Sequence, residues 1–158
     1  MTAAPERELA VPAITQYDVM TLVGPSVVGE PVVVELHYAA DDPVTVTLTL
    51  DSVVSDVPHR SWTFERRLLD LGTDEPVEAG GVRVSPVWHA RGGIAVLFEL
   101  GTEVGRSGPV DQVAVRAELP VVRRFVDKIH RAVPAGTEWT RLGRLMELSD
   151  SSCFTTVE

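Results

Sequence analysis

The side chains that most often bind metals or act as nucleophiles are few in this chain and far apart. There are four histidines and one cysteine, at His37, His59, His89, His130 and Cys153. None of them forms a His-x-x-x-His, His-Glu-x-x-His or Cys-x-x-Cys spacing, so a metal site would require a convergence in space that the sequence does not indicate. A single cysteine cannot form an internal disulfide, which fits a reducing cytoplasm. We therefore expect no metal ligand, no cofactor and a cytoplasmic protein.

Three short segments come near to catalytic or phosphate-binding patterns without completing them. Ser26, within Gly-Pro-Ser-Val-Val-Gly at residues 24–29, misses the Gly-x-Ser-x-Gly spacing of a nucleophile elbow. The glycine-rich segment 101–108 lacks the Gly-Lys-Ser/Thr ending of a P-loop and is typical of a hairpin loop. Asp41 and Asp42 lie in an expected turn with no apolar pocket around them. The sequence therefore predicts no catalytic residue, and a protein that is not an enzyme.

Charge is distributed unevenly along the chain. The formal net charge is −9, yet residues 116–144 carry seven basic and three acidic side chains, a local excess of about +4 that leaves about −13 elsewhere. A basic segment on an acidic body favours an acidic protein partner and disfavours a phosphate backbone. The candidate protein-interaction residues are Arg83, Arg123, Arg124, Lys128 and Arg131. The alternatives are a solvated helix face for the last four and a surface ion pair for Arg83.

Length and hydropathy favour one domain over residues 1–158. A chain of 158 residues with 44% hydrophobic residues can bury one sizeable core. We expect this core to span about residues 19–138, with residues 1–18 and 144–158 flexible. The first nine residues have no apolar stretch typical of a leader, and no apolar run is long enough to span a membrane.

Alternation of apolar and polar residues predicts most of the structure. Residues 44–50 alternate strictly between apolar side chains and threonine, and residues 32–38 repeat the pattern, so the two segments are expected to pair in antiparallel fashion. Asp42 and Pro43 suit the turn between them, because proline fixes φ and disfavours a helical conformation in the preceding residue. Further strands are expected at residues 19–23, 60–64, 82–88, 94–100 and 113–117.

Two segments follow a helical pattern instead. Residues 65–71 are expected to form a short helix, and residues 119–133 a long amphipathic helix that ends before Pro134 and Gly136. Gly80 and Gly81 suit a tight turn with positive φ. The sequence thus predicts an α+β fold, mostly antiparallel β with about seven strands, one short helix and one long helix.

Spaced motifs between Tyr38 and Glu138 resemble the core of the SsgA-like proteins, which are actinobacterial sporulation and cell division proteins. They are Tyr38 with Asp42-Pro43, then Trp62-x-Phe64-x-Arg66-x-Leu68-Leu69, then Gly81-Val82-Arg83-Val84-x-Pro86, and finally Phe125 with Val133-Pro134-Ala135-Gly136-Thr137-Glu138. Their order and spacing carry the resemblance more than any one motif does. Ser85, the segment 101–112 and the first thirty residues depart from the family pattern.

The resemblance implies a Whirly-like fold, a homotrimer and a non-enzymatic adaptor in septation. One branch of the family recruits the tubulin-like protein FtsZ, so division proteins such as FtsZ, or another SsgA-like protein, are the partners it implies, at division septa. Single-stranded nucleic-acid binding is the alternative that a Whirly-like fold suggests, although it requires exposed aromatic side chains beside a basic groove.

The motifs themselves have a structural interpretation. Trp62 and Phe64 share one face of a strand and are expected in the core, where Leu68 and Leu69 cover them from the short helix. The role of Arg66 is left open: it either forms an ion pair with a carboxylate or belongs to an interface. The motifs thus identify a fold better than an activity.

Overall fold

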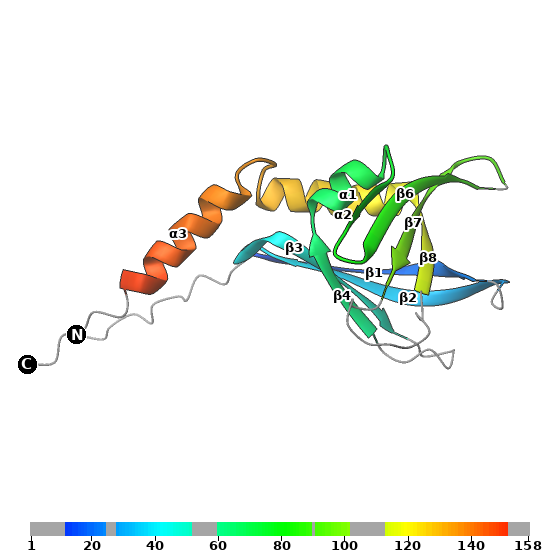
Figure 1. The fold of residues 1–158 in the computed structure, drawn as a ribbon, viewed down its shortest axis with the longest axis horizontal. Coiled ribbons are helices and arrows are strands. Elements are labelled where there is room, and N and C mark those ends of the chain that lie inside the picture. Colours follow the sequence, from blue (N-terminus) through cyan, green and yellow to red (C-terminus); the bar gives the residue numbers. More distant parts are fainter. Residues whose placement is uncertain (1–11, 25–27, 52–59, 90, 102–112, 152–158) are drawn as a thin grey trace, which may run out of the picture.

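A computed structural model describes residues 12–24, 28–51, 60–89, 91–101 and 113–151. These residues form eight strands and three helices (Figure 1). In chain order they are β1 (Ala13–Val23), β2 (Val28–Ala39), β3 (Asp42–Asp51), β4 (Arg60–Glu65), α1 (Arg67–Gly72), β5 (Val77–Ala79), β6 (Val82–Trp88), β7 (Ile94–Leu100), β8 (Val113–Glu118), α2 (Leu119–Ala132) and α3 (Glu138–Ser151). The α+β class and the mostly antiparallel architecture predicted from the sequence are confirmed.

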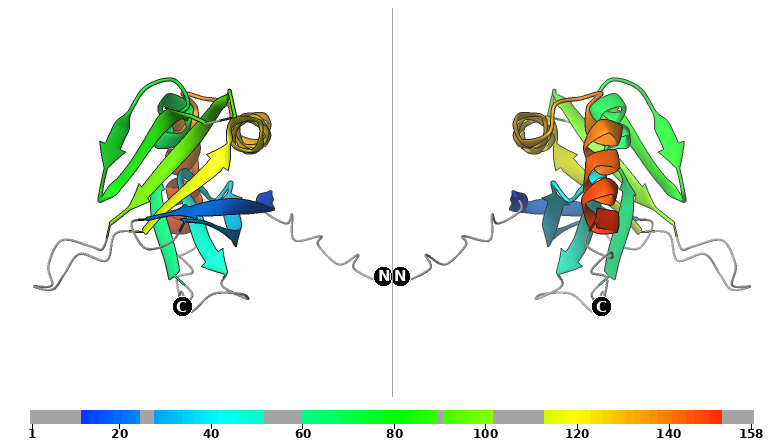
Figure 2. Two further views of the ribbon diagram at one scale, coloured as in Figure 1. Left: turned by 90° about the vertical axis from the view of Figure 1, so that its right-hand side faces the viewer. Right: turned by 90° about the vertical axis from the view of Figure 1, so that its left-hand side faces the viewer.

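All eight strands belong to one antiparallel sheet with the order β4-β3-β2-β1-β8-β7-β6-β5. The sheet has two halves, β1–β4 and β5–β8. Strand β1 joins them, because it pairs with β2 along nearly its whole length but with β8 only from Thr21 to Val23. Beyond that short ladder β1 and β8 diverge, and the two halves fold toward each other (Figure 2). Helix α2 contacts β1, β7 and β8 and so lies along the space between the diverging strands β1 and β8.

The core lies between the inner faces of the two halves. Each inner face follows the expected period of two: Leu36, Leu48 and Phe64 come from one half, and Val84 and Phe98 from the other. The rings of Phe64 and Phe98 meet across the core with centroids 6.5 Å apart. The predicted pairing of residues 32–38 with 44–50 is confirmed as the β2–β3 ladder.

Helix α2 closes this core with one apolar stripe. Val122, Phe125 and Ile129 are buried along it, and each contributes roughly 1.5–3 kcal/mol in hydrophobic free energy. The helix ends as predicted, since the Val133 backbone N–H caps the Ile129 carbonyl and Gly136 adopts φ of 84°.

The Gly80-Gly81 turn is also confirmed, because both residues have positive φ, 59° and 80°. It brings the Gly81 carbonyl to the backbone N–H of Gly101, which donates a 2.8 Å hydrogen bond to it. The Gly101 carbonyl in turn accepts a bond from the Trp62 indole at 3.2 Å. Trp62 is only partly buried, whereas Phe64 lies in the core as expected.

Several elements differ from the sequence-based prediction. Asp42 and Pro43, expected in the turn, are the first two residues of β3, and β2 begins at Val28 rather than at residue 32. Strand β5 was missed because it has only three residues, and β1 begins at Ala13, six residues before the expected start. Helix α3 was not predicted at all. The segments 1–18 and 144–158, which were expected to be flexible, therefore include the start of β1 and the second half of α3. The loop predicted at residues 101–108 lies, apart from Gly101, outside the described residues.

Candidate functional site

A cationic face lies on the solvent side of α2. Arg123, Arg124 and Arg131 are exposed there, opposite the buried stripe. Among the described residues, none of these three guanidinium groups forms an ion pair or a hydrogen bond, and Asp127 on the same face does not reach them. Three arginines without partners are a surface that can accept acidic groups from another molecule.

Lys128, predicted as part of this face, serves instead to attach α2 to β1. Its ammonium group donates a hydrogen bond to Gln16 Oε1 at 3.1 Å, and Gln16 is only 6% exposed. The amide nitrogen of Gln16 donates to the Val121 carbonyl at 3.1 Å and to Asp18 at 2.6 Å. We therefore exclude Lys128 from the candidate site.

Arg83 lies on a different surface. It is on the outer face of β6, directly across from Glu99 on β7, and its Nε atom is 3.4 Å from a Glu99 carboxylate oxygen. Helix α1 contacts β6 on the opposite, inner face, where Gly72 lies against Val84. The structure thus gives Arg83 the surface ion pair that was one of its two alternatives and does not bring it to the α2 arginines.

An apolar groove adjoins the cationic face and was not predicted. The inner faces of β6 and β7 extend past the core to the Trp88–Ile94 pair, which no helix covers: Trp88 is 82% exposed and Ile94 40%. Arg123 borders this groove of about 250 Å³, together with Asp74 from the α1–β5 connection. Exposed tryptophan beside arginine is the composition typical of residues that dominate binding energy at protein interfaces. The available signal was a large aromatic residue at the last position of a predicted strand.

The motif residues converge elsewhere, around the buried side chain of Arg66, which is 2% exposed. Its Nη1 atom donates to the Tyr38 hydroxyl at 3.2 Å and to the Val133 carbonyl at 2.8 Å, and its Nη2 atom forms an ion pair with Glu138. That contact is close but not aligned as a hydrogen bond. The Tyr38 hydroxyl donates onward to the Pro43 carbonyl at 3.1 Å. These motif residues hold the fold together and are not available to a ligand.

The electrostatics of this cluster follow from burial and from the Arg66 charge. Burial alone would raise the pKa of Glu138, but backbone N–H groups and the Arg66 guanidinium outweigh it, so the pKa of this carboxyl lies below its ordinary value. Burial raises the pKa of the Tyr38 phenol, and Arg66 only partly offsets the increase. Arg66 is thus paired with a carboxylate and hydrogen-bonded to a neutral phenol.

Within the part of the chain that the structure describes, no group of three or more histidine, cysteine, aspartate or glutamate side chains could hold a metal ion. No helix in that part is long and apolar enough to cross a membrane.

The sequence and the fold are similar to those of known sporulation proteins. The model of the family described as "Streptomyces sporulation and cell division protein, SsgA" matches residues 32–138. The sporulation-specific cell division protein SsgB of Kineococcus radiotolerans is 33% identical over 89% of this chain and 78% of its own length. The protein of the same name from Streptomyces coelicolor is 29% identical over 75% of this chain and 80% of its own length.

Two solved structures share the fold. The crystal structure of an SsgA-like sporulation-specific cell division protein from Thermobifida fusca aligns with a TM-score of 0.75 and 25% identity, covering 89% of this chain and 96% of that one. A structure of SsgB, described with mutations that correlate to longitudinal cell division during sporulation of Streptomyces coelicolor, aligns with a TM-score of 0.69 and 27% identity over 83% and 96% of the two chains.

Proposed function

Because this chain belongs to the SsgA family of sporulation and cell division proteins, we propose that it is a non-enzymatic adaptor in sporulation-linked septum formation. It binds division machinery and positions it at the septum from the cytoplasm. The observation that carries this proposal is the exposed Trp88 beside Arg123, continuous with the α2 arginines, which have no partner among the described residues. The site has the composition of a protein-binding surface.

The partner that this surface fits is a protein with an acidic, partly apolar face. Its carboxylates would pair with Arg123, Arg124 and Arg131, and an apolar side chain would cover Trp88 and Ile94. We propose FtsZ, or a second SsgA-like protein that in turn binds FtsZ. A homotrimer presents three copies of the surface, and several weak contacts to a polymerising partner then add up to firm attachment.

The test is a charge reversal on α2. The variant Arg123→Glu/Arg124→Glu/Arg131→Glu should fold and assemble like the wild type, because all three side chains are exposed and have no partner in the described part of the chain. It should co-sediment with FtsZ filaments about tenfold less well. The control Arg67→Glu/Arg144→Glu reverses two exposed arginines away from the surface and should bind normally. Unchanged binding by the triple variant, together with normal septal localisation of its fluorescent fusion, would remove the α2 surface from the proposal.

Single-stranded nucleic acid is the second candidate, because Trp88 is an aromatic residue exposed beside Arg123 and could stack on a base. The net charge of −9 opposes it. A salt-sensitive gel shift with a single-stranded oligonucleotide at physiological ionic strength would support this candidate, and the absence of a shift would retire it.

A further inference from the structure

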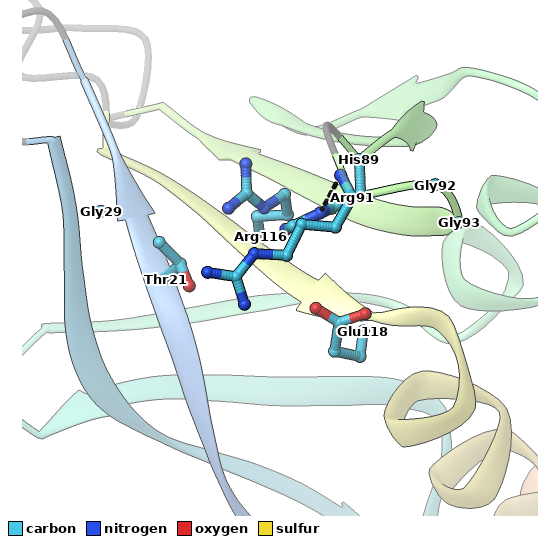
Figure 3. Close-up of a pocket in the computed structure, with 8 residues that line it drawn as sticks. All are labelled: Thr21, Gly29, His89, Arg91, Gly92, Gly93, Arg116 and Glu118. Atoms are coloured by element: carbon cyan, nitrogen blue, oxygen red, sulfur yellow. Dashed lines mark hydrogen bonds between the residues drawn. The ribbon is translucent and has the colours of Figure 1, made fainter.

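A polar cavity of about 550 Å³ opens on the outer face of the sheet, away from α2. It lies between β1 and the turn that joins β6 to β7, at the Thr21–Arg116 pair where the β1–β8 ladder ends. The side chains of Arg91, Arg116 and Glu118 line it (Figure 3). Two guanidinium groups therefore share the cavity with one carboxylate.

The two arginines have no partner inside the described part of the molecule. Figure 3 shows both side chains extending over β8 toward β1, and neither guanidinium forms an ion pair or a hydrogen bond with a described residue. The Arg91 backbone N–H donates to His89 Nδ1 at 3.1 Å, and the Gly92 N–H donates to the His89 carbonyl at 3.0 Å. These bonds hold the backbone of Arg91 and Gly92 next to His89, at the edge of the cavity.

An exposed apolar strip adjoins the cavity along β1. Val19 is 69% exposed and Tyr17 64%, and both share the outer face with Thr21 because side chains alternate along a strand. Val33 of β2 lies directly across from Val19. The distance from Thr21 to Val19 along the strand is about 6.6 Å, which equals the spacing of every second side chain in an extended peptide.

We propose that this cavity binds an acidic, extended segment of a partner protein, with a carboxylate held between Arg91 and Arg116 and an apolar side chain resting on Val19. The proposal goes beyond the adaptor function of the α2 surface and does not depend on it.

A peptide carboxylate suits the cavity better than a free phosphate does. Glu118 repels a dianion more strongly than a single carboxylate, and it can accept a hydrogen bond from a peptide N–H. A volume of about 550 Å³ also exceeds what one small anion fills. The apolar strip beside the arginines would add nothing to phosphate binding, but it matches a neighbouring apolar residue in a peptide.

The experiment uses the full chain and a short peptide with blocked ends. Ser stands at every second position of the peptide, and Glu and Leu alternate at the positions between. Titration followed by NMR should move the resonances of Thr21, Arg91 and Arg116 and give a measurable Kd. The variant Arg91→Gln/Arg116→Gln should bind about tenfold more weakly, because each arginine contributes charge-assisted hydrogen bonds. The single variant Arg91→Gln repeats the test without changing a strand residue. Val19→Thr, which keeps the branched shape, should weaken binding a few-fold through lost apolar contact.

The matched control Arg67→Gln/Arg144→Gln removes the same charge from exposed positions outside the cavity and should leave Kd unchanged. A peptide with Gln in place of Glu should not bind. Equal binding of the Gln peptide would overturn the proposal, as would the absence of any shift at about 1 mM peptide. Inorganic phosphate that moves the same resonances with the same Kd as the peptide would identify a small-anion site instead.

Discussion

Helices α2 and α3 have the same length, 14 residues each, but are attached to the sheet by different forces. Helix α2 buries an apolar stripe in the core. None of the described side chains of α3 is buried, and Trp139 is 70% exposed. Polar contacts hold α3 at its first turn instead: the Arg66–Glu138 ion pair and a 2.8 Å hydrogen bond from Arg141 Nε to the Ala40 carbonyl. Beyond that turn the helix runs away from the sheet (Figure 1).

This difference distinguishes α2, which completes the core, from α3, which is attached to the domain without a buried side chain among those described. Loss of the α2 stripe would open the core, so α2 should unfold only with the whole domain. Helix α3 can detach without exposing the core, so it should open locally at a lower free energy. Arg66 connects the two regions, because it contacts the Val133 carbonyl at the end of α2 and the Glu138 carboxylate at the start of α3.

The largest expected effect comes from truncating the α2 stripe. Phe125 is fully buried, and Phe125→Ala should lower the free energy of unfolding by about 3–5 kcal/mol through lost burial and a cavity. Urea unfolding followed by circular dichroism would measure it. Val126→Ala, one position further along and only partly buried, is the control and should lose clearly less. A loss below about 1 kcal/mol for Phe125→Ala would contradict the core position of α2.

The second effect tests the link between the helices. Arg66→Met removes a buried cation and leaves Glu138 and the Val133 carbonyl without their partner, so we expect a loss of about 3 kcal/mol. Amide hydrogen exchange should show faster opening across α3 than across β2 and β3. Arg67→Met, at an exposed neighbouring arginine, should change neither quantity by more than about 0.5 kcal/mol. Uniform acceleration across the whole chain would show that α3 is not a separate unit.

The same contrast explains what could be predicted from the sequence. The α2 stripe and the β2–β3 pair were found because repeated burial leaves a periodic pattern, with Val122, Phe125 and Ile129 at helical spacing. In β1 the two inward positions before Met20 are both polar: Asp18, and Gln16, which is buried and bonded to α2. Apolar alternation therefore does not extend back to Ala13. Helix α3 depends on Arg66, which lies 72 residues before Glu138, and no local pattern reveals such a contact.

The site was harder to predict than the fold. The α2 arginines were found because they cluster along one segment, and all three do share an exposed face. Lys128 was included because its bond to Gln16 joins residues far apart in the chain. The Trp88 groove and the Arg91–Arg116 cavity were missed because each is assembled at the end of a ladder, where exposure depends on where the neighbouring elements stop.

The smallest effect is a dependence on pH that is confined to the attachment of α3. The pKa of Glu138 is lower in the folded protein than its ordinary value of 4.5. The ionised carboxylate therefore stabilises the folded state fully above about pH 4.5, and this contribution is lost as the pH falls from there through the lowered pKa. Glu138→Gln has no charge to lose. The difference in unfolding free energy between wild type and Glu138→Gln should be largest at neutral pH and shrink below pH 4.5. The control Trp139→Ser removes no titrating group, so its unfolding free energy should depend on pH as that of the wild type does. A difference that stays constant down to pH 3 would mean that the Glu138 charge does not contribute to holding α3, and that Arg141 and Ala40 carry the attachment instead.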